Sequence, residues 1–416
     1  MMMRYFHFLF AAALLLAFVL SISIQLNNKA VLQVHTPHDF QLSQSWQFYA
    51  ASDMVGRMVH APSMVELPDG KIRAFWFAGS REGAQDVSIN TAVFDPKLDR
   101  WLAETVAVER QWLNAQMGRY TRKLGNAVPV LDADGRMRLF VVAVSFGSWA
   151  SSRIMVLNSY DLGETWQFST ELKTSPLLNI STLVKTPPIQ YTDGSIGLPV
   201  YHEFIGKFGE ILRIDQLNRV VNISRMGSGR QAIQPLVLAT TDQQLVAFFR
   251  PHKKGYVLQS QSDDAGLSWQ DIQPTSLENP GSAVGGVSLS PSHWLIASNC
   301  NKKDRDEMCI KETWDAGKTW SVHWQVHDQR EWRGKPLNHT QLIAMIPEDI
   351  TQDPEVDQEQ LYRAAKDKIC EGGERCEFRF DYPYLIQAKN GDVHMLYTWN
   401  KTLIRHARLQ AKPSVQ

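Results

Sequence analysis

The chain has 416 residues, of which 44% are hydrophobic, and its 43 basic and 43 acidic residues give a formal net charge of zero. A chain of this size can bury a large core, and its neutral balance gives it no general attraction to nucleic acid. We therefore expect a folded protein without a nucleic-acid partner.

The first 28 residues are predicted to form a membrane-targeting helix. Tyr5 to Leu26 is almost wholly apolar, follows Arg4 and precedes Asn27-Asn28-Lys29, and about twenty apolar residues suffice to span a bilayer. Because no small-residue cleavage signal is evident, an uncleaved anchor is favoured over a cleaved signal peptide, and a buried core helix is the alternative. We expect an exported protein, anchored in the inner membrane and facing the periplasm, or secreted if the segment is cleaved, with a linker over residues 29–44.

Six apolar stretches with a tight turn at their middle predict β-hairpins. The turns are Asp-Gly or Asn-Gly in four of them, and Asp-Gln and Pro-Ser in the other two. The hairpins are expected at residues 63–76, 128–144, 189–201, 236–249, 287–298 and 384–399.

An eight-residue pattern, Ser/Thr-x-Asp-x-Gly-x-Ser/Thr-Trp, occurs three times, starting at Ser159, Ser262 and Thr313. Its Asp can accept backbone N–H bonds and its Gly can adopt positive φ, so each copy predicts a turn between strands. The Asp residues are 103 and 51 residues apart, and a period near fifty suits a four-stranded propeller blade. Degraded copies are expected at residues 95–101 and 213–215.

Six hairpins and these turns predict an all-β, six-bladed β-propeller over residues 45–410, with a tail at 411–416. Leu403 to Leu409 should pair with the segment before Ser63 to close the ring. Residues 110–122 form a long connection between the first two blades, and residues 347–377 form an insertion with a short helix at 357–368.

The eight-residue pattern is the Asp-box, or bacterial neuraminidase repeat, and residues 45–410 resemble the sialidase (neuraminidase) superfamily, in particular its divergent bacterial members called predicted neuraminidases. The resemblance implies an exo-acting glycoside hydrolase that removes a terminal acidic sugar. It also implies a Tyr nucleophile that is activated by Glu, and three arginines on the substrate carboxylate.

Two cysteine pairs, Cys300 with Cys309 and Cys370 with Cys376, each bracket a short loop. Local disulfides suit an exported protein, whereas the spacings match no common zinc site. Neither a metal nor an organic cofactor is indicated.

Strand alternation places the hairpin turns and the Asp-boxes on one rim and a candidate site on the other. The side chains that enter the first strands or leave the second strands should therefore lie together. They are His60, Asn126, Lys185, Gln234, Tyr382, Arg81, Glu82, His202, Glu203, Arg250, Asn299 and Trp399.

Arginine binds carboxylates in a bidentate manner, so Arg81 and Arg250 predict an acidic glycan as ligand, with Arg405 (rather than its neighbour His406) or Arg57 as a third cation. The resemblance implies Tyr382 and Glu203 as the nucleophile pair and Glu82 or Asp86 as the acid/base. Asn279 is a candidate for a sugar hydroxyl or a plain turn residue.

The triplet His60-Ala61-Pro62 stands where sialidases have an Arg-Ile-Pro element, so the first carboxylate arginine is missing. Two alternatives stay open beside hydrolysis. One is a polysaccharide lyase in which His60 or His202 removes the C5 proton of a uronate, and the other is a non-catalytic glycan-binding propeller. In each case we expect a monomer.

Overall fold

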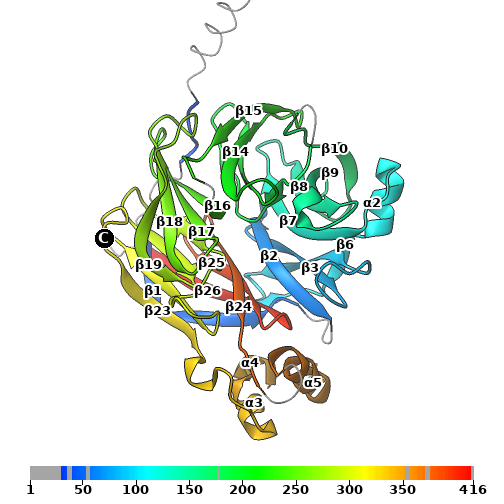
Figure 1. Ribbon diagram of the computed structural model, residues 1–416, viewed down its shortest axis with the longest axis vertical. Helices are drawn as coiled ribbons and strands as arrows, with labels where there is room; N and C mark the ends of the chain where they lie inside the picture. Colours follow the sequence, from blue (N-terminus) through cyan, green and yellow to red (C-terminus); the bar gives the residue numbers. More distant parts are fainter. Residues whose placement is uncertain are drawn as a thin grey trace, which may run out of the picture.

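The computed structural model describes residues 30–34, 40–52, 57–175, 179–229, 231–351, 357–370 and 375–413. These residues form six antiparallel sheets arranged as blades around a ring (Figure 1). The predicted six-bladed propeller is thus confirmed. The predicted targeting helix lies outside the described residues, and among those that are described no helix is long and apolar enough to cross a membrane.

Each blade contains at least four strands, in chain order from the axis outward except in the sixth blade, whose outermost strand comes first in the chain. The first blade holds β2 (Met58–Glu66), β3 (Ile72–Gly79), β4 (Ser88–Asp95), β5 (Arg100–Trp101) and β6 (Thr105–Val108). The second holds β7 (Lys123–Leu131), β8 (Met137–Val144), β9 (Ser152–Ser159) and β10 (Gln167–Glu171). The third holds β11 (Leu183–Val184), β12 (Ile189–Gln190), β13 (Ile196–His202), β14 (Phe208–Ile214) and β15 (Val220–Arg225).

The remaining blades repeat this order. The fourth holds β16 (Ala232–Ala239), β17 (Leu245–Pro251), β18 (Gly255–Ser262) and β19 (Gln273–Asn279). The fifth holds β20 (Gly285–Ser288), β21 (Trp294–Ser298), β22 (Glu307–Thr313) and β23 (Ser321–Asp328). The sixth holds β24 (Phe380–Gln387), β25 (Val393–Trp399), β26 (Leu403–Pro413) and β1 (Phe40–Ala50).

The sixth blade closes the ring as predicted. Strand β1 pairs with β26 in antiparallel register, from Phe40 opposite Pro413 to Ala50 opposite Arg405. The ring therefore extends slightly beyond the predicted limits of 45 and 410.

The Asp-boxes form the turns between the third and fourth strands of the second, fourth and fifth blades. In the second box, Asp264 Oδ1 accepts hydrogen bonds from the Ser262 hydroxyl and the Ser268 backbone N–H, both at 2.8 Å. Gly266 has φ +88°, and its carbonyl accepts a 3.2 Å bond from the Trp269 indole. The same Asp bonds recur in the other two boxes. The turns at the two predicted degraded boxes occupy the equivalent positions in the first and third blades.

Each junction between neighbouring blades encloses one cluster of buried apolar side chains, because both faces of every sheet pack against another sheet. Between the sixth and first blades, for example, Trp76 and Phe94 pack with Tyr384 and Leu396. These cores keep the blades in fixed positions, so the loops at the ring's two rims rest on a rigid support.

Helices occur in the connections. Helix α2 (Arg110–Met117) lies in the predicted long connection, η1 (Trp149–Ser151) precedes β9, and η2 (Arg330–Trp332) opens the insertion. Helices α3 (His339–Met345), α4 (Glu348–Thr351) and α5 (Gln358–Ile369) project together from the edge of the ring (Figure 1). The predicted helix at 357–368 is α5, which begins where Asp357 accepts the Gln360 N–H at 3.0 Å. The helical part starts earlier than the predicted 347.

Candidate functional site

The candidate site lies at the start of the innermost strands, on the rim opposite the Asp-boxes. Strands β2, β16 and β24 share an irregularity there, in which a residue with positive φ precedes a proline and the ladder shifts register. The positive-φ residues are Ala61 (53°), Gln234 (52°) and Tyr382 (55°). Positive φ is costly for residues other than glycine, and such strain is concentrated at functional sites.

Tyr382 is held by an amide. Gln234 Nε2 donates to the Tyr382 hydroxyl at 3.1 Å and lies 3.3 Å from the Tyr201 hydroxyl, while Gln234 Oε1 accepts from Arg250 Nη1 at 3.3 Å. Burial raises the pKa of Tyr382, although Arg250 lowers it in part. Arg250 Nε is buried and has no hydrogen-bond partner among the described residues. Tyr382 therefore stays protonated at neutral pH, and Gln234 links its hydroxyl to the Arg250 guanidinium.

His60 packs against Tyr382. The two ring centroids are 4.6 Å apart with the planes at 69°, and a second edge contact joins His60 to Phe77 at 5.5 Å. Burial lowers the pKa of His60 to about 4, against the opposing influence of Asp381 and Glu82. Within the described part of the chain, Nδ1 of this ring has no hydrogen-bond partner. The imidazole is thus neutral at physiological pH and has an unused nitrogen.

A second arginine reaches the site from the loop between β21 and β22. Arg305 Nη1 donates to Asp381 Oδ1 at 2.7 Å, and its Nη2 donates to the Gly281 carbonyl at 3.1 Å. Asp381 precedes Tyr382 and is 1% exposed. Burial raises the pKa of Asp381, but Arg305 and His60 together lower it by more than burial raises it, so the pKa lies below its usual value. The pair is therefore ionised and places a guanidinium next to the Tyr382 backbone.

Two acidic residues follow β3. Glu82 accepts from Lys401 Nζ at 3.0 Å, and although burial raises its pKa, His60 and Lys401 lower it below the usual range. Asp86 instead organises its own loop by accepting from the Ser80 backbone N–H at 2.8 Å and the Ser80 hydroxyl at 3.0 Å. Glu82, and not Asp86, is thus the carboxylate in electrostatic contact with His60.

Lys185 crosses the centre of the ring. Its ammonium donates to the carbonyls of Val284, at 3.4 Å, and Pro383, which belong to the fifth and sixth blades. Burial lowers the pKa of Lys185 to about 7. Lys185 therefore fixes the backbone next to Tyr382 from the opposite side of the ring.

Other predicted site residues stabilise loops. His202 bonds Glu210 at 2.8 Å and stacks on Phe208. The Glu203 backbone N–H donates to the Ser181 hydroxyl. Arg81, by contrast, is exposed to solvent. No hydrogen bond joins Glu203 to Tyr382 within the described residues. The predicted Tyr–Glu contact is therefore replaced by a Tyr–Gln contact.

The predicted asparagines also stabilise the backbone. Asn126 donates to the Val184 carbonyl at 2.8 Å, and Asn279 Oδ1 accepts the N–H groups of Gly281 and Ser282, each at 2.8 Å. Asn279 thus matches the plain turn alternative.

Trp399 and Arg405 do not face the site. Trp399 is 1% exposed and belongs to the apolar core between the fifth and sixth blades. Arg405 lies on the third strand of its blade, buried with its guanidinium 5.7 Å from the Phe48 ring centroid. His406, on the opposite face, contacts His394 and Trp101. Both faces of a third strand pack against neighbouring blades, so neither residue can reach the axis.

Arg57 stabilises the first blade by donating to the Ala78 and Asp86 carbonyls.

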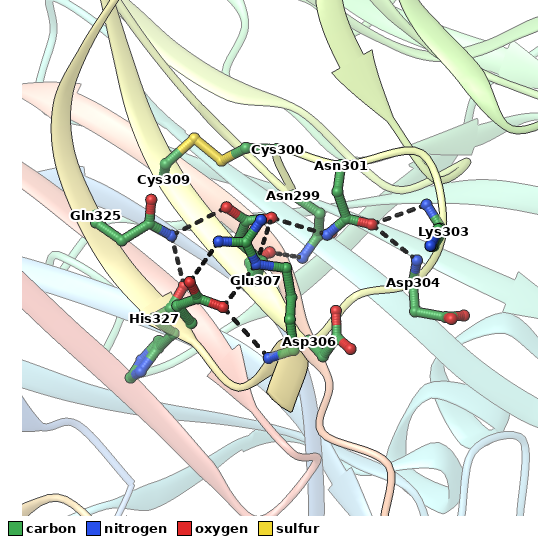
Figure 2. A network of polar contacts seen from close by, with 12 residues as sticks. Asn299, Cys300, Asn301, Lys303, Asp304, Asp306, Glu307, Cys309, Gln325 and His327 are labelled. Carbon is green, nitrogen blue, oxygen red and sulfur yellow. Dashed lines mark hydrogen bonds and ion pairs between the residues drawn. A yellow bond between two sulfur atoms is a disulfide. The ribbon is translucent and has the colours of Figure 1, made fainter. Parts of the chain in front are cut away.

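Both cysteine pairs are disulfides, and the first closes the loop that carries Arg305. In this loop Asn299 Nδ2 donates to the carbonyls of Arg305, Glu307 and Phe380, at 3.2, 2.7 and 3.0 Å. Figure 2 shows Asn299 beside the disulfide, with Asn301 capping the turn through the N–H groups of Lys303 and Asp304. The loop is thus built to hold Arg305. The sequence predicts the cysteine pair but not the role of Arg305. The signal for Arg305 was its position inside a loop that two cysteines close on the rim of the site.

Known structures share this architecture at low sequence identity. A Hadza microbial sialidase, Hz136, aligns with a TM-score of 0.60 and 13% identity over 86% of this chain, and the chain spans 66% of that protein's length. A protein of unknown function from Dyadobacter fermentans aligns with a TM-score of 0.63 and 10% identity over 88% of this chain and 98% of its own. The intramolecular trans-sialidase from Ruminococcus gnavus aligns with a TM-score of 0.57 and 13% identity over 88% and 96%. These likenesses support the fold.

No similar sequence is found among curated proteins. The family model of the BNR repeat-like domain matches residues 70–395, which is most of the chain and includes all three Asp-boxes and five of the six blades in large part. The chain therefore belongs to the BNR repeat-like domain family and is a sialidase-like propeller.

Proposed function

We propose that the protein is an exo-acting, sialidase-like glycoside hydrolase that removes a terminal acidic sugar from a glycan. The convergence of Tyr382 with Arg250 and Arg305, which come from three different blades, carries this proposal. Two guanidinium groups beside one phenol suit a sugar that carries a carboxylate near the carbon under attack.

In the proposed reaction the Tyr382 oxygen attacks the anomeric carbon while its phenol proton passes to a water molecule, the glycosidic bond breaks, and the leaving oxygen takes a proton from protonated Glu82. A second water then attacks the same carbon and gives a proton to Glu82, and the sugar leaves as the Tyr382 oxygen takes a proton back from water. Because the pKa of Glu82 is lowered and that of Tyr382 is raised, turnover should be slow at neutral pH and should increase as the pH falls.

The Tyr382–Gln234 contact supports a second candidate, β-elimination at a uronate. A neutral amide cannot take the phenol proton, whereas neutral His60 beside the phenol can remove the C5 proton while Tyr382 protonates the leaving oxygen. The arginines would neutralise the carboxylate. Elimination requires unprotonated His60, so its rate should fall as the pH drops through about 4, the reverse of hydrolysis.

The test is to incubate the protein with sialosides and polyuronates from acidic to neutral pH, and to follow both released reducing sugar and the ultraviolet absorbance of an unsaturated uronate. Reducing sugar without absorbance supports hydrolysis, and absorbance supports elimination. Tyr382→Phe should abolish either activity, whereas Tyr160→Phe, a matched control on an Asp-box at the opposite rim, should retain it. Glycan binding without any turnover would overturn both reactions and leave a binding propeller.

The variant Gln234→Glu places a carboxylate where it can accept the Tyr382 proton. If the protein hydrolyses glycosides, this variant should increase the rate by at least tenfold, within the usual gain from a positioned general base. Gln234→Leu, which also removes the amide but offers no base, is the control and should be slower than the natural chain.

A further inference from the structure

A hollow of about 250 Å³ lies beside the candidate site, and of its lining residues only Arg305 takes part in the proposed reaction. The loops that line it follow or precede β17, β19, β21, β23 and β24, so it opens on the same rim as Tyr382. It is lined by Lys254, Pro280, Lys303, Asp304, Arg305, Asp306, Arg333, Glu377, Phe378 and Arg379.

Basic side chains outnumber acidic ones in this hollow, with five against three, although the whole chain is neutral. Arg333 and the buried Asp306 neutralise each other through bonds of 2.5 and 2.6 Å. Lys303 is exposed and its ammonium forms no ion pair with any described residue, and Arg379 reaches only Glu377, at 3.3 Å. Two cations therefore remain available to an anion from outside.

The hollow is continuous with the proposed catalytic residues. Arg305 lines it and also binds Asp381, and Arg379 lies three positions before Tyr382 with its backbone N–H held by Asn400 at 2.6 Å. A second hollow, of about 490 Å³, shares Glu377 and Arg379 and adds three basic residues, Lys368, Arg375 and Lys401, and one acidic residue, Asp367. A basic band thus extends from the site across the fourth to sixth blades.

We propose that this hollow is a second subsite, which binds the anionic group, carboxylate or sulfate, of the sugar next to the terminal one. The inference rests on the proposed function, because it assumes that the terminal acidic sugar occupies Arg250 and Arg305. Lys303 and Arg379 contact the second anion. The disulfide and Asn299 hold the Lys303 loop in place before binding, which lowers the entropic cost of association.

The test compares the dissociation constants of disaccharides that differ only in the second residue's charge. One pair is digalacturonate with its reducing-side carboxylate free or methyl-esterified, and the other is sialyl-α2,3-galactose with or without a sulfate on galactose. We expect the anionic member of a pair to bind roughly tenfold more tightly at low salt, because each exposed ion pair contributes up to about fivefold.

In the double variant Lys303→Gln, Arg379→Gln the ratio within a pair should fall toward one. Lys318→Gln, which removes a charge on the third Asp-box at the opposite rim, should leave the ratio unchanged. A ratio near one in the natural chain, or a ratio that survives in the double variant, would overturn the subsite while the terminal sugar still binds. If no member of either pair binds, or if Arg250→Gln leaves the affinity for the neutral members intact, the proposed function itself fails.

Discussion

Lys185 shows how one residue sets the electrostatics at the centre of the ring. Its ammonium bonds two carbonyls and lies 6.0 Å from the Tyr382 ring centroid and 5.7 Å from that of Tyr384. Carbonyl dipoles and aromatic faces replace only part of the lost hydration, and for this reason burial lowers the pKa of Lys185 to about 7. The folded state therefore favours the neutral amine.

This shift makes the stability of the protein depend on pH. The unfolded chain, with a lysine pKa of about 10.4, binds more protons than the folded chain between about pH 7 and that value, so the free energy of unfolding should rise with pH across this window. We expect a rise of about 2 kcal/mol from pH 7 to 9. Urea unfolding of the natural chain and of Lys185→Met should show that the variant lacks this rise. Lys318→Met is the exposed control, and an identical pH profile for all three proteins would contradict the assignment.

At the scale of elements, the loop between β21 and β22 couples stability to ligand binding. Asn299 is fully buried and binds the backbone of the loop that carries Arg305, whereas Asn279 holds Gly281, whose carbonyl accepts from the Arg305 guanidinium. Asn299 thus acts as a positioning residue, since it touches Arg305 and not the ligand.

Replacing Asn299 by Ala removes a donor shared by three carbonyls and should lower the free energy of unfolding by about 2 kcal/mol. It should also weaken binding of an acidic sugar about tenfold, because Arg305 loses its fixed position. Asn218→Ala is the control, because Asn218 is a buried amide that bonds Ser169 on the opposite rim, and it should lower stability while leaving affinity close to that of the natural chain. Calorimetry of both variants checks the prediction, and equal effects on affinity would refute the positioning role.

The elements differ in how far sequence could predict them. The Asp-box turns were predictable because their hydrogen bonds join residues at most four positions apart, as between Asp264 and Ser268. The contact between Gln234 and Tyr382 spans 148 positions and depends on two bulges, so alternation alone could not predict it. The resemblance implies Glu203 as the partner of Tyr382, and the fold places the amide of Gln234 there instead. The inward orientation of Trp399 depends on which face of β25 packs against the fifth blade. Side chains alternate between the two faces of a strand, and this alternation does not tell which face is which.

At the scale of the whole molecule, the closure between β1 and β26 fastens the ring. Trp46 of β1 stacks on Trp324 of the fifth blade with centroids 5.7 Å apart, and Phe48 packs on the same ring at 5.0 Å. Strand β1 thus contacts two blades, and the predicted closure explains why six blades fold as one body.

Trp46→Ala should therefore weaken the whole ring and not only its outer strand. Removal of a nearly buried tryptophan costs about 3 kcal/mol, and at about 2 °C per kcal/mol for a chain of this size the melting temperature should fall by roughly 6 °C. Differential scanning calorimetry should show one transition at a lower temperature. A separate early transition with the main one unmoved would show that the closure is only local. Trp314→Ala, at an exposed Asp-box position, is the control.

The same closure dictates an order of events during synthesis on the ribosome. Strand β1 emerges first, yet its hydrogen-bonding partner, residues 403–413, is translated more than 350 positions later. At about 5 to 20 residues per second, β1 waits for roughly 20 to 70 seconds while the intervening blades are made. A strand that carries the apolar side chains of Trp46 and Phe48 thus remains unpaired for the whole of elongation, so the nascent chain offers chaperones a binding segment that disappears only when the last blade is complete.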